Sequence, residues 1–289
     1  MRGPSGSYIE ENNSLAVALI MTLPLLRFLQ TTLHKAWHKH AMTVAMVLSG
    51  VSILGSQSRG ALLGVSAMLM LLWWRGKNKF ATAVVMLLCG VVFLSFMPDT
   101  WWDRMGTLRT YEEDRSAMGR LNAWWMAFNI AKENFFGGGF SIYNQFVYGL
   151  YAPDPTMIVS AHSIYFHILG EHGFVGLIIY LCLWLSTWRT AGWLRKHGRA
   201  QAETEWCVQL GSMIQVSLVG FAIGGAFLSL AYFDLPYNLL ALAVAARVWV
   251  ASKGWQSEPS VVPERRIFGI PLFLGDRLVT PQGSRLGQA

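Results

Sequence analysis

Charged residues are scarce in this chain of 289 residues: they make up 13% of it, against about 25% in a typical soluble domain. Hydrophobic residues make up 53%. They are gathered in runs long enough to cross a bilayer, which takes about 20 residues of helix. One soluble core does not account for this pattern. The composition therefore predicts an all-α, polytopic membrane helix bundle.

Cysteine is also scarce. Cys89, Cys182 and Cys207 lie far apart, inside or beside apolar runs, and form no CxxC pair. This excludes a disulfide framework and a cysteine zinc site, and we interpret the three as small hydrophobic residues. The sequence also lacks a P-loop, a dinucleotide glycine fingerprint and a GxSxG elbow. No DxD-like pair is present to hold a metal for sugar-nucleotide chemistry.

The long apolar runs predict about seven transmembrane helices. The expected spans are 13–33, 41–57, 60–74, 80–97, 173–190, 206–232 and 236–252. The net charge is +7, and basic residues cluster in short segments between these runs, at 35–39, 75–79 and 189–199. That pattern is typical of cytoplasmic loops under the positive-inside rule. It lacks the continuous basic face with interleaved aromatic residues that binds nucleic acid, so no nucleic-acid partner is expected.

The charge asymmetry also predicts the topology. The loops at 34–40, 75–79 and 189–205 are expected in the cytoplasm, and residues 98–172 are expected to form one large exoplasmic helical loop. The membrane domain would then cover 1–252, with a cytoplasmic tail at 253–289.

The exoplasmic loop contains a predicted amphipathic helix at 119–135. Its apolar residues recur near i, i+3, i+4 and i+7, and the glycine run 137–139 should end it. Four tryptophans suit the headgroup level of a membrane: Trp101, Trp102, Trp124 and Trp125. We expect this loop to lie on the membrane, over the mouth of the bundle.

Three outward-facing residues are candidates for chemistry. Arg59 and Arg120 carry guanidinium groups, which bind phosphate through a planar fork. Arg59 could instead extend toward headgroup phosphates, and Arg120 could pair with acidic residues at 112–114. His162 precedes the fifth span, where a neutral imidazole can take a proton from a hydroxyl. The alternative for a lone histidine is a structural role.

Neighbouring titratable residues are weaker candidates. His167 and His172 follow His162 at i+5 and i+10 and do not share its helical face. No zinc site is expected from the three, because the i, i+4 spacing of a helical histidine pair is absent and no cysteine is near. Glu171 could orient a base or could be a simple loop charge.

An ordered set of short strings resembles the O-antigen ligase family of bacterial inner-membrane proteins. The strings are Ser58-Arg59-Gly60-Ala61-Leu62, Gly119-Arg120 followed by Trp124, Gly137-Gly138-Gly139, Ala161-His162-Ser163-Ile164-Tyr165 and Glu171-His172-Gly173. Two further strings are similar to the O-glycosylation ligase branch associated with the exosortase A system: Tyr111-Glu112-Glu113-Asp114 with Met118-Gly119-Arg120, and Leu228 to Asp234.

The resemblance implies a reaction at the periplasmic face of the inner membrane. Such ligases take a glycan from undecaprenyl-diphosphate and pass it to an acceptor hydroxyl on a protein or a lipid glycan, with no metal or other cofactor. His162 matches the essential histidine proposed as general base. Arg59 and Arg120 match the arginines thought to hold the diphosphate. Fixed cations help most where negative charge develops on the leaving group.

The resemblance covers nearly all of residues 5–250, but family members usually carry several further spans before the region matching residues 6–13. The resemblance therefore implies an N-terminally truncated ligase that lacks these further spans. A polysaccharide polymerase shares the carrier chemistry and is the second interpretation; its product is a ladder of chain lengths on lipid. A membrane transporter or scaffold is the third, and the absence of an inverted repeat argues against it.

Overall fold

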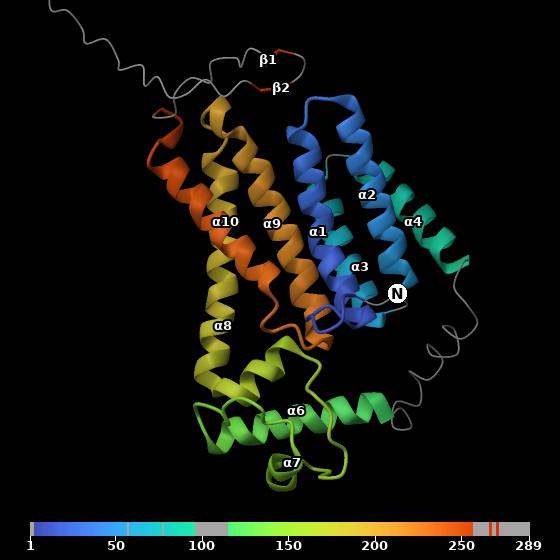
Figure 1. Cartoon of the computed structure of the whole chain (residues 1–289), viewed down its shortest axis with the longest axis vertical. Coiled ribbons are helices and arrows are strands. Elements are labelled where there is room, and N and C mark those ends of the chain that lie inside the picture. Colours follow the sequence, from blue (N-terminus) through green and yellow to red (C-terminus); the bar gives the residue numbers. More distant parts are fainter. Residues whose placement is uncertain are drawn as a thin grey trace, which may run out of the picture.

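The computed structural model describes residues 3–56, 58–76, 78–95, 115–256, 266–267 and 270–271. Regular structure in these residues is helical, apart from one pair of two-residue strands (Figure 1). The predicted all-α class is therefore confirmed. Residues 96–114, with Trp101, Trp102 and the acidic string at 112–114, lie outside the described residues. So does most of the predicted tail.

Each predicted span corresponds to a helix, but the predicted span 206–232 is too long, because the helix ends at Gly224 and residues 228–232 form a loop after η3 (Gly225–Phe227). These helices are α1 (Asn12–Thr32), α2 (Ala36–Gly55), α3 (Arg59–Arg75), α4 (Lys79–Ser95), α8 (Ile164–His197), α9 (Glu205–Gly224) and α10 (Asp234–Ala251). Three segments of the described chain are long and apolar enough to cross a membrane, namely Asn12–Thr32, Ile164–His197 and Ala202–Phe227. The chain is thus a membrane protein, while the number of seven spans stays a prediction.

The remaining elements are short or lie outside the predicted spans. They are α6 (Arg115–Glu133), α7 (Gln145–Tyr151), the 3-10 turns η2 (Ala202–Thr204), η3 (Gly225–Phe227) and η4 (Gly254–Gln256), and the antiparallel strands β1 (Arg266–Ile267) and β2 (Ile270–Pro271). α6 corresponds to the predicted amphipathic helix, shifted by a few residues.

The span helices run side by side, and α6 lies across one end of them, with α7 beyond it (Figure 1). We name this the α6 end. The α2–α3 turn and the loop 228–233 lie toward the α6 end. The connections after α1, α3 and α8 lie at the opposite end. The basic loops predicted to share one side of the membrane therefore share one end of the bundle.

α9 is the central helix, packing against α1, α3 and α8. Glycines let its backbone come close to these neighbours, as small residues do between membrane helices. A Cβ on Gly211 would lie 2.4 Å from the Ala191 carbonyl oxygen of α8. One on Gly224 would lie 2.7 Å from Val17 of α1. Larger side chains at these points would push the helices apart.

α6 buries a different face from the one its aromatic pattern predicts. Its buried positions are mostly small, namely Gly119, Asn122, Ala123, Met126, Ala127, Ile130 and Ala131. The predicted apolar residues Leu121, Trp125 and Phe128 are exposed. The small residues are buried because they let the backbone of α6 come close to the segment that contains Met157 and Val159. A Cβ on Gly119, for example, would already lie 3.2 Å from Val159. The aromatic face is left for the membrane surface expected there.

α8 is bent at Gly173, where φ is 65° and ψ is −164°, a conformation essentially restricted to glycine. The glycine run after α6 packs into this bend. Gly138 N–H donates to the Gly170 carbonyl oxygen and Gly139 N–H to that of Glu171, both at 2.9 Å. The run ends α6, as predicted, and also satisfies carbonyls that the bend frees. The predicted span begins at this bend, at residue 173. Because the helix continues through the bend, α8 begins at Ile164, nine residues earlier.

Candidate functional site

The chain leading to His162 is held by side chains of α6. Asn122 is buried and donates through Nδ2 to the carbonyl oxygens of Asp154 and Met157, at 2.8 and 3.1 Å. Its Oδ1 accepts from the Asp154 N–H at 2.9 Å. Residues 152–163 form neither helix nor strand, so their backbone groups need other partners, and the Asn122 amide satisfies three of them.

Aromatic side chains fix the end of the same segment. Trp124 Nε1 donates to the Ala161 carbonyl oxygen at 2.7 Å, and its ring stacks on Phe166 at 4.8 Å between centroids. The Tyr148 hydroxyl of α7 donates to the Val159 carbonyl oxygen. Trp124 therefore contacts the residue before His162 and the first turn of α8 together, which fixes the position of the histidine between them.

His162 occupies an unusual backbone conformation. Its φ is 42°, in the left-handed region that a residue with a Cβ rarely adopts. Ser163 then returns to extended geometry and α8 begins at Ile164. Such strain persists only where surrounding contacts impose it, and it is concentrated at functional sites. The contacts of Trp124 and Tyr148 supply that constraint.

The surroundings of His162 favour its neutral form. Burial lowers the pKa of the imidazole below its usual value, and the positive charge of Arg120 lowers it further. The carboxylate of Glu11 acts in the opposite direction on this pKa. His162 and Arg120, far apart in sequence, are thus close enough to interact. At neutral pH the ring is a base with a free nitrogen lone pair.

A cavity of about 520 Å³ opens beside His162, and we name it the His162 pocket. Its lining residues are mostly polar: Ser7, Tyr8, Glu10, Glu11, Asn12, Ser14, Ser160, His162 and Ser229. They come from the segment before α1, the first turn of α1 and the two loops that meet at the α6 end. Many hydroxyl groups and two carboxylates face this space, which suits a hydroxyl-rich ligand such as a sugar.

Arg59 lies at the first position of α3, in the turn that follows α2. Ser58 caps this helix, its hydroxyl accepting from the Ala61 N–H at 3.2 Å. Asn12, which lines the His162 pocket, donates to the Ser56 carbonyl oxygen in the same turn at 2.9 Å. This hydrogen bond connects the pocket with the turn that carries Arg59. The Arg59 side chain is half-buried and is not among the pocket lining.

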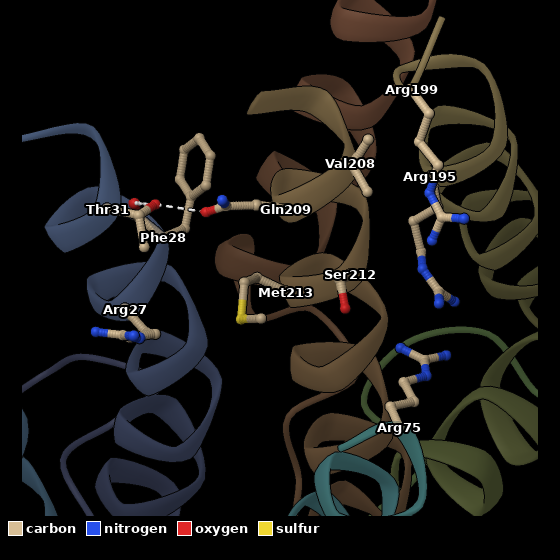
Figure 2. Close-up of a pocket in the computed structure, with 10 residues that line it drawn as sticks. All are labelled: Arg27, Phe28, Thr31, Arg75, Arg195, Arg199, Val208, Gln209, Ser212 and Met213. Atoms are coloured by element: carbon tan, nitrogen blue, oxygen red, sulfur yellow. Dashed lines mark hydrogen bonds between the residues drawn. The ribbon is translucent and has the colours of Figure 1, made fainter. Parts of the chain in front are cut away.

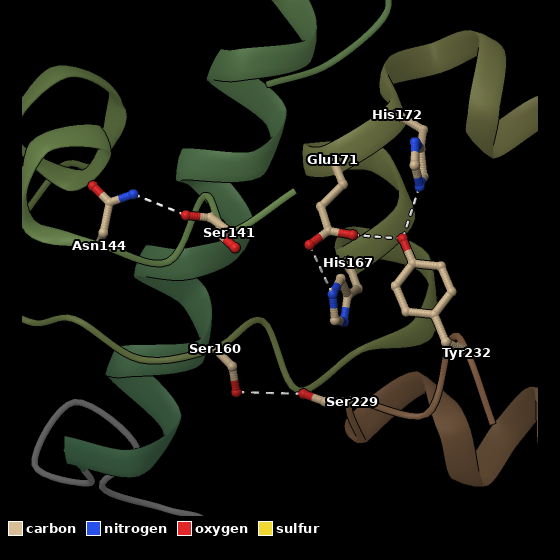
Figure 3. Close-up of polar contacts among 8 residues, drawn as sticks. All are labelled: Ser141, Asn144, Ser160, His167, Glu171, His172, Ser229 and Tyr232. Atoms are coloured by element: carbon tan, nitrogen blue, oxygen red, sulfur yellow. Dashed lines mark hydrogen bonds and ion pairs between the residues drawn. The ribbon is translucent and has the colours of Figure 1, made fainter. Parts of the chain in front are cut away.

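A second polar cluster lies next to the pocket, and we name it the Glu171 cluster: His167, Glu171, His172 and Tyr232 (Figure 3). Glu171 is 5% exposed. It pairs with His167 Nε2 at 3.2 Å and accepts from the Tyr232 hydroxyl. That hydroxyl also lies 2.7 Å from His172 Nε2. Glu171 thus contacts His167 and Tyr232, and its expected role in orienting a base stays a prediction.

The loop 228–233 joins the cluster to the pocket. Ser229 Oγ donates to Ser160 Oγ at 3.3 Å, and both serines line the His162 pocket (Figure 3). Tyr232 follows three residues later and reaches Glu171. Burial, followed by the hydrogen bond to Glu171, raises the pKa of the Tyr232 hydroxyl, so it remains a protonated donor. The histidines at i+5 and i+10 from His162 therefore contact this loop, not the pocket.

Sequence reasoning did not identify Glu11, Ser160, Ser229 or Tyr232 as members of the site. Ser160 stands next to the string that carried the resemblance, and Ser229 and Tyr232 lie within the Leu228–Asp234 string. Those strings were the available signal. Glu11 lies within residues 6–13, which the resemblance also covers, but only the folded chain brings this segment to His162.

The described residues contain no group of three or more His, Cys, Asp or Glu side chains suited to hold a metal ion. Residues 44–181 match the model of a protein family described as O-antigen ligase. This range includes Arg59, Arg120 and His162. The match supports an O-antigen ligase-type membrane enzyme. No curated protein matches the chain.

Proposed function

We propose that this chain, with an O-antigen ligase match over residues 44–181, transfers a glycan from undecaprenyl-diphosphate to an acceptor hydroxyl. His162 is the observation on which the proposal depends. A strained, half-buried histidine whose pKa is lowered stands beside a polar cavity at one end of a helix bundle. General bases need this combination of a neutral ring and access for a hydroxyl.

In the proposed step, a ring nitrogen of His162 takes the proton of the acceptor hydroxyl. The hydroxyl oxygen attacks the anomeric carbon of the glycan and forms the new glycosidic bond. The bond from that carbon to the diphosphate oxygen breaks, and its electron pair leaves with the diphosphate. The proton ends on His162 and the negative charge on the leaving lipid diphosphate.

Arg120 and Arg59 are assigned to the diphosphate. Arg120 is electrostatically coupled to His162, so a diphosphate held by its guanidinium would lie near the acceptor oxygen. Arg59 sits at the start of α3, where helix N–H groups also favour an anion. Fixed cations stabilise the charge that develops on the leaving group, a contribution that often exceeds any other in such sites.

The α6 end is proposed to face the periplasm. The basic connections collect at the opposite end of the bundle, and basic loops favour the cytoplasm. The bacterial inner membrane, a multi-pass topology and a protein or lipid glycan acceptor follow from the same proposal. We also propose that the chain belongs to the exosortase-associated branch of O-glycosylation ligases, because the Leu228–Asp234 string is similar to that branch.

The test is His162→Gln in membranes that contain the lipid-linked donor. Glutamine keeps polarity and approximate size but has no basic nitrogen. Transfer should fall by about 10²–10⁴-fold, because removal of a general base acts on the chemical step. Donor binding, measured separately, should stay near that of the wild type. A ladder of chain lengths on lipid as the product would identify a polymerase.

His197→Gln is the matched control, since His197 is exposed at the opposite end. His172→Gln tests the Glu171 cluster, and we expect it to have a smaller effect than His162→Gln. Near-normal transfer by His162→Gln, with wild-type protein active in the same membranes, would show that His162 is not the base.

A further inference from the structure

Two arginines converge on one neutral acceptor at the end of the bundle opposite α6. Arg75, at the end of α3, donates through Nη2 to Gln215 Oε1 at 2.8 Å. Arg195, near the end of α8, donates through Nη1 to the same oxygen at 2.9 Å. Gln215 of α9 is 3% exposed, and its Nε2 donates to the Trp188 carbonyl oxygen at 3.0 Å. The amide is therefore fixed in place.

This arrangement brings two positive charges together, and the described contact that offsets the charge of Arg75 is with an aromatic face: its Cζ lies 5.6 Å from the centroid of the Trp188 ring. The two guanidinium nitrogens share one acceptor, so they lie within about 6 Å, close enough for like charges to repel. In the described part of the chain no carboxylate forms an ion pair with either arginine. Arg75 Nη1 is buried and has no hydrogen-bond partner among the described residues. A buried charged donor without a hydrogen-bond acceptor is costly, so this position favours the binding of an anion.

A cavity of about 390 Å³ lies beside these side chains. Its lining includes two further arginines and several hydrogen-bonding residues: Arg27, Phe28, Thr31, Arg75, Arg195, Arg199, Val208, Gln209, Ser212 and Met213. Figure 2 shows Arg75, Arg195 and Arg199 on one side of it and Arg27 on the other. Its volume falls within the range of about 300–1,000 Å³ seen for small-molecule sites.

We propose that this cavity, the arginine pocket, binds a phosphate group. Guanidinium forks match phosphate oxygens, and an anion there would receive the unused donor of Arg75. The group is either a phospholipid headgroup or free inorganic phosphate. Basic residues gather at cytoplasmic membrane edges in any case. That rule explains exposed residues such as Arg189, but not two arginines that converge on a buried amide.

The site is distinct from the His162 pocket. Its residues lie at the opposite end of the bundle, and Arg27, Arg195 and Gln215 fall outside the residues that match the ligase family. Its occupancy therefore does not depend on the proposed transfer reaction. An anion held between α1, α3, α8 and α9 would connect the central helix with its three neighbours and stabilise the bundle.

The experiment measures the melting temperature of the whole chain in neutral detergent at low ionic strength. Inorganic phosphate is added in one series, phosphatidylglycerol in a second and zwitterionic phosphatidylcholine in a third. We expect stabilisation by phosphate or by phosphatidylglycerol, with little effect of phosphatidylcholine. Stabilisation by phosphatidylglycerol alone identifies a lipid headgroup, and stabilisation by inorganic phosphate identifies a free anion.

Two variants and a matched control locate the effect. Arg75→Gln should raise the half-saturating concentration at least about tenfold, because it removes a charged donor. Arg189→Gln makes the same charge change at an exposed position of α8 and should behave as the wild type. Gln215→Glu places a carboxylate between Arg75 and Arg195, so it should abolish the response while keeping or raising the melting temperature without anion.

The proposal is wrong if neither phosphate nor phosphatidylglycerol stabilises the wild-type chain. It is also wrong if Arg189→Gln weakens the response as much as Arg75→Gln does, since the effect would then be general surface charge. An undiminished response in folded Gln215→Glu protein would likewise exclude this pocket.

Discussion

Burial lowers the pKa of His162 most, and two opposite charges adjust it further. Arg120 lowers the pKa in addition to burial, and Glu11 raises it. Neither neighbour is near His162 in sequence. Each can be removed separately, so the proposed role of the base can be tested by the position of a pH profile as well as by a rate.

The first prediction concerns that profile. The base acts in its neutral form, which is present above the folded pKa, so transfer should fall as the pH drops through a value below about 6.5. Arg120→Gln removes a cation, raises the pKa of His162 and should move this acid limb to higher pH. Glu11→Gln should move it to lower pH. The measurement is kcat/KM against pH for the three proteins.

Arg120→Gln is also expected to slow transfer, because Arg120 is assigned to the diphosphate. The pH at which kcat/KM falls does not depend on how much the overall rate is reduced. Shifts of both variants in the same direction would contradict the electrostatic assignment.

Arg59 gives the second prediction at this scale. Arg59→Lys keeps the charge but replaces a planar fork with a point ammonium. Transfer should fall on the order of 100-fold, equivalent to a few kcal/mol of transition-state stabilisation. The assay is glycan transfer in membranes, with Arg189→Lys as the exposed control. Wild-type rates for Arg59→Lys would assign Arg59 to a headgroup contact instead.

At the scale of the elements, the bend of α8 depends on a single residue, Gly173. The bend at Gly173 turns the helix so that Glu171 faces Tyr232, while the glycine run after α6 fills the bend. A Cβ on Gly173 would lie 2.1 Å from the Phe135 carbonyl oxygen and 2.5 Å from Gly137 N. Both of these neighbours are backbone atoms, which cannot move aside cheaply.

Gly173→Ala should therefore destabilise the protein by about 3 kcal/mol or more, from backbone strain and overpacking together. The measurement is thermal denaturation in detergent. Gly149→Ala is the control, since a Cβ at this position in α7 meets nothing within 4 Å. It should be neutral or slightly stabilising, because alanine favours helix over glycine. Equal melting temperatures of the two variants would contradict the account of the bend.

At the scale of the whole molecule, the two ends of the bundle differ in chemistry. The α6 end carries the His162 pocket, with Glu10 and Glu11 in its lining. The opposite end carries the arginine pocket and the basic connections. This polarity gives the bundle a preferred orientation in a membrane.

Reporter fusions test that orientation. Fusions at Gly76 and Gly198, both at the opposite end, should report the cytoplasm. A fusion at Tyr151, at the end of α7, should report the periplasm. The physical cause is the excess of Lys and Arg in the short connections. A periplasmic signal at Gly76 would overturn the topology and, with it, the periplasmic site.

The sequence by itself determined the helical class, the positions of the span helices and the loops that share an end. These follow from local hydrophobic runs and charge, which act within a segment of about 20 residues. It also indicated Arg120 and His162 as candidates. Only the tertiary structure brought Glu11, Ser229 and Tyr232 to the site and placed Arg75 beside Arg195, because those contacts join helices far apart in the chain. It likewise decided which face of α6 is buried, since close backbone packing there favoured a face rich in glycine and alanine over the face that carries Trp125 and Phe128.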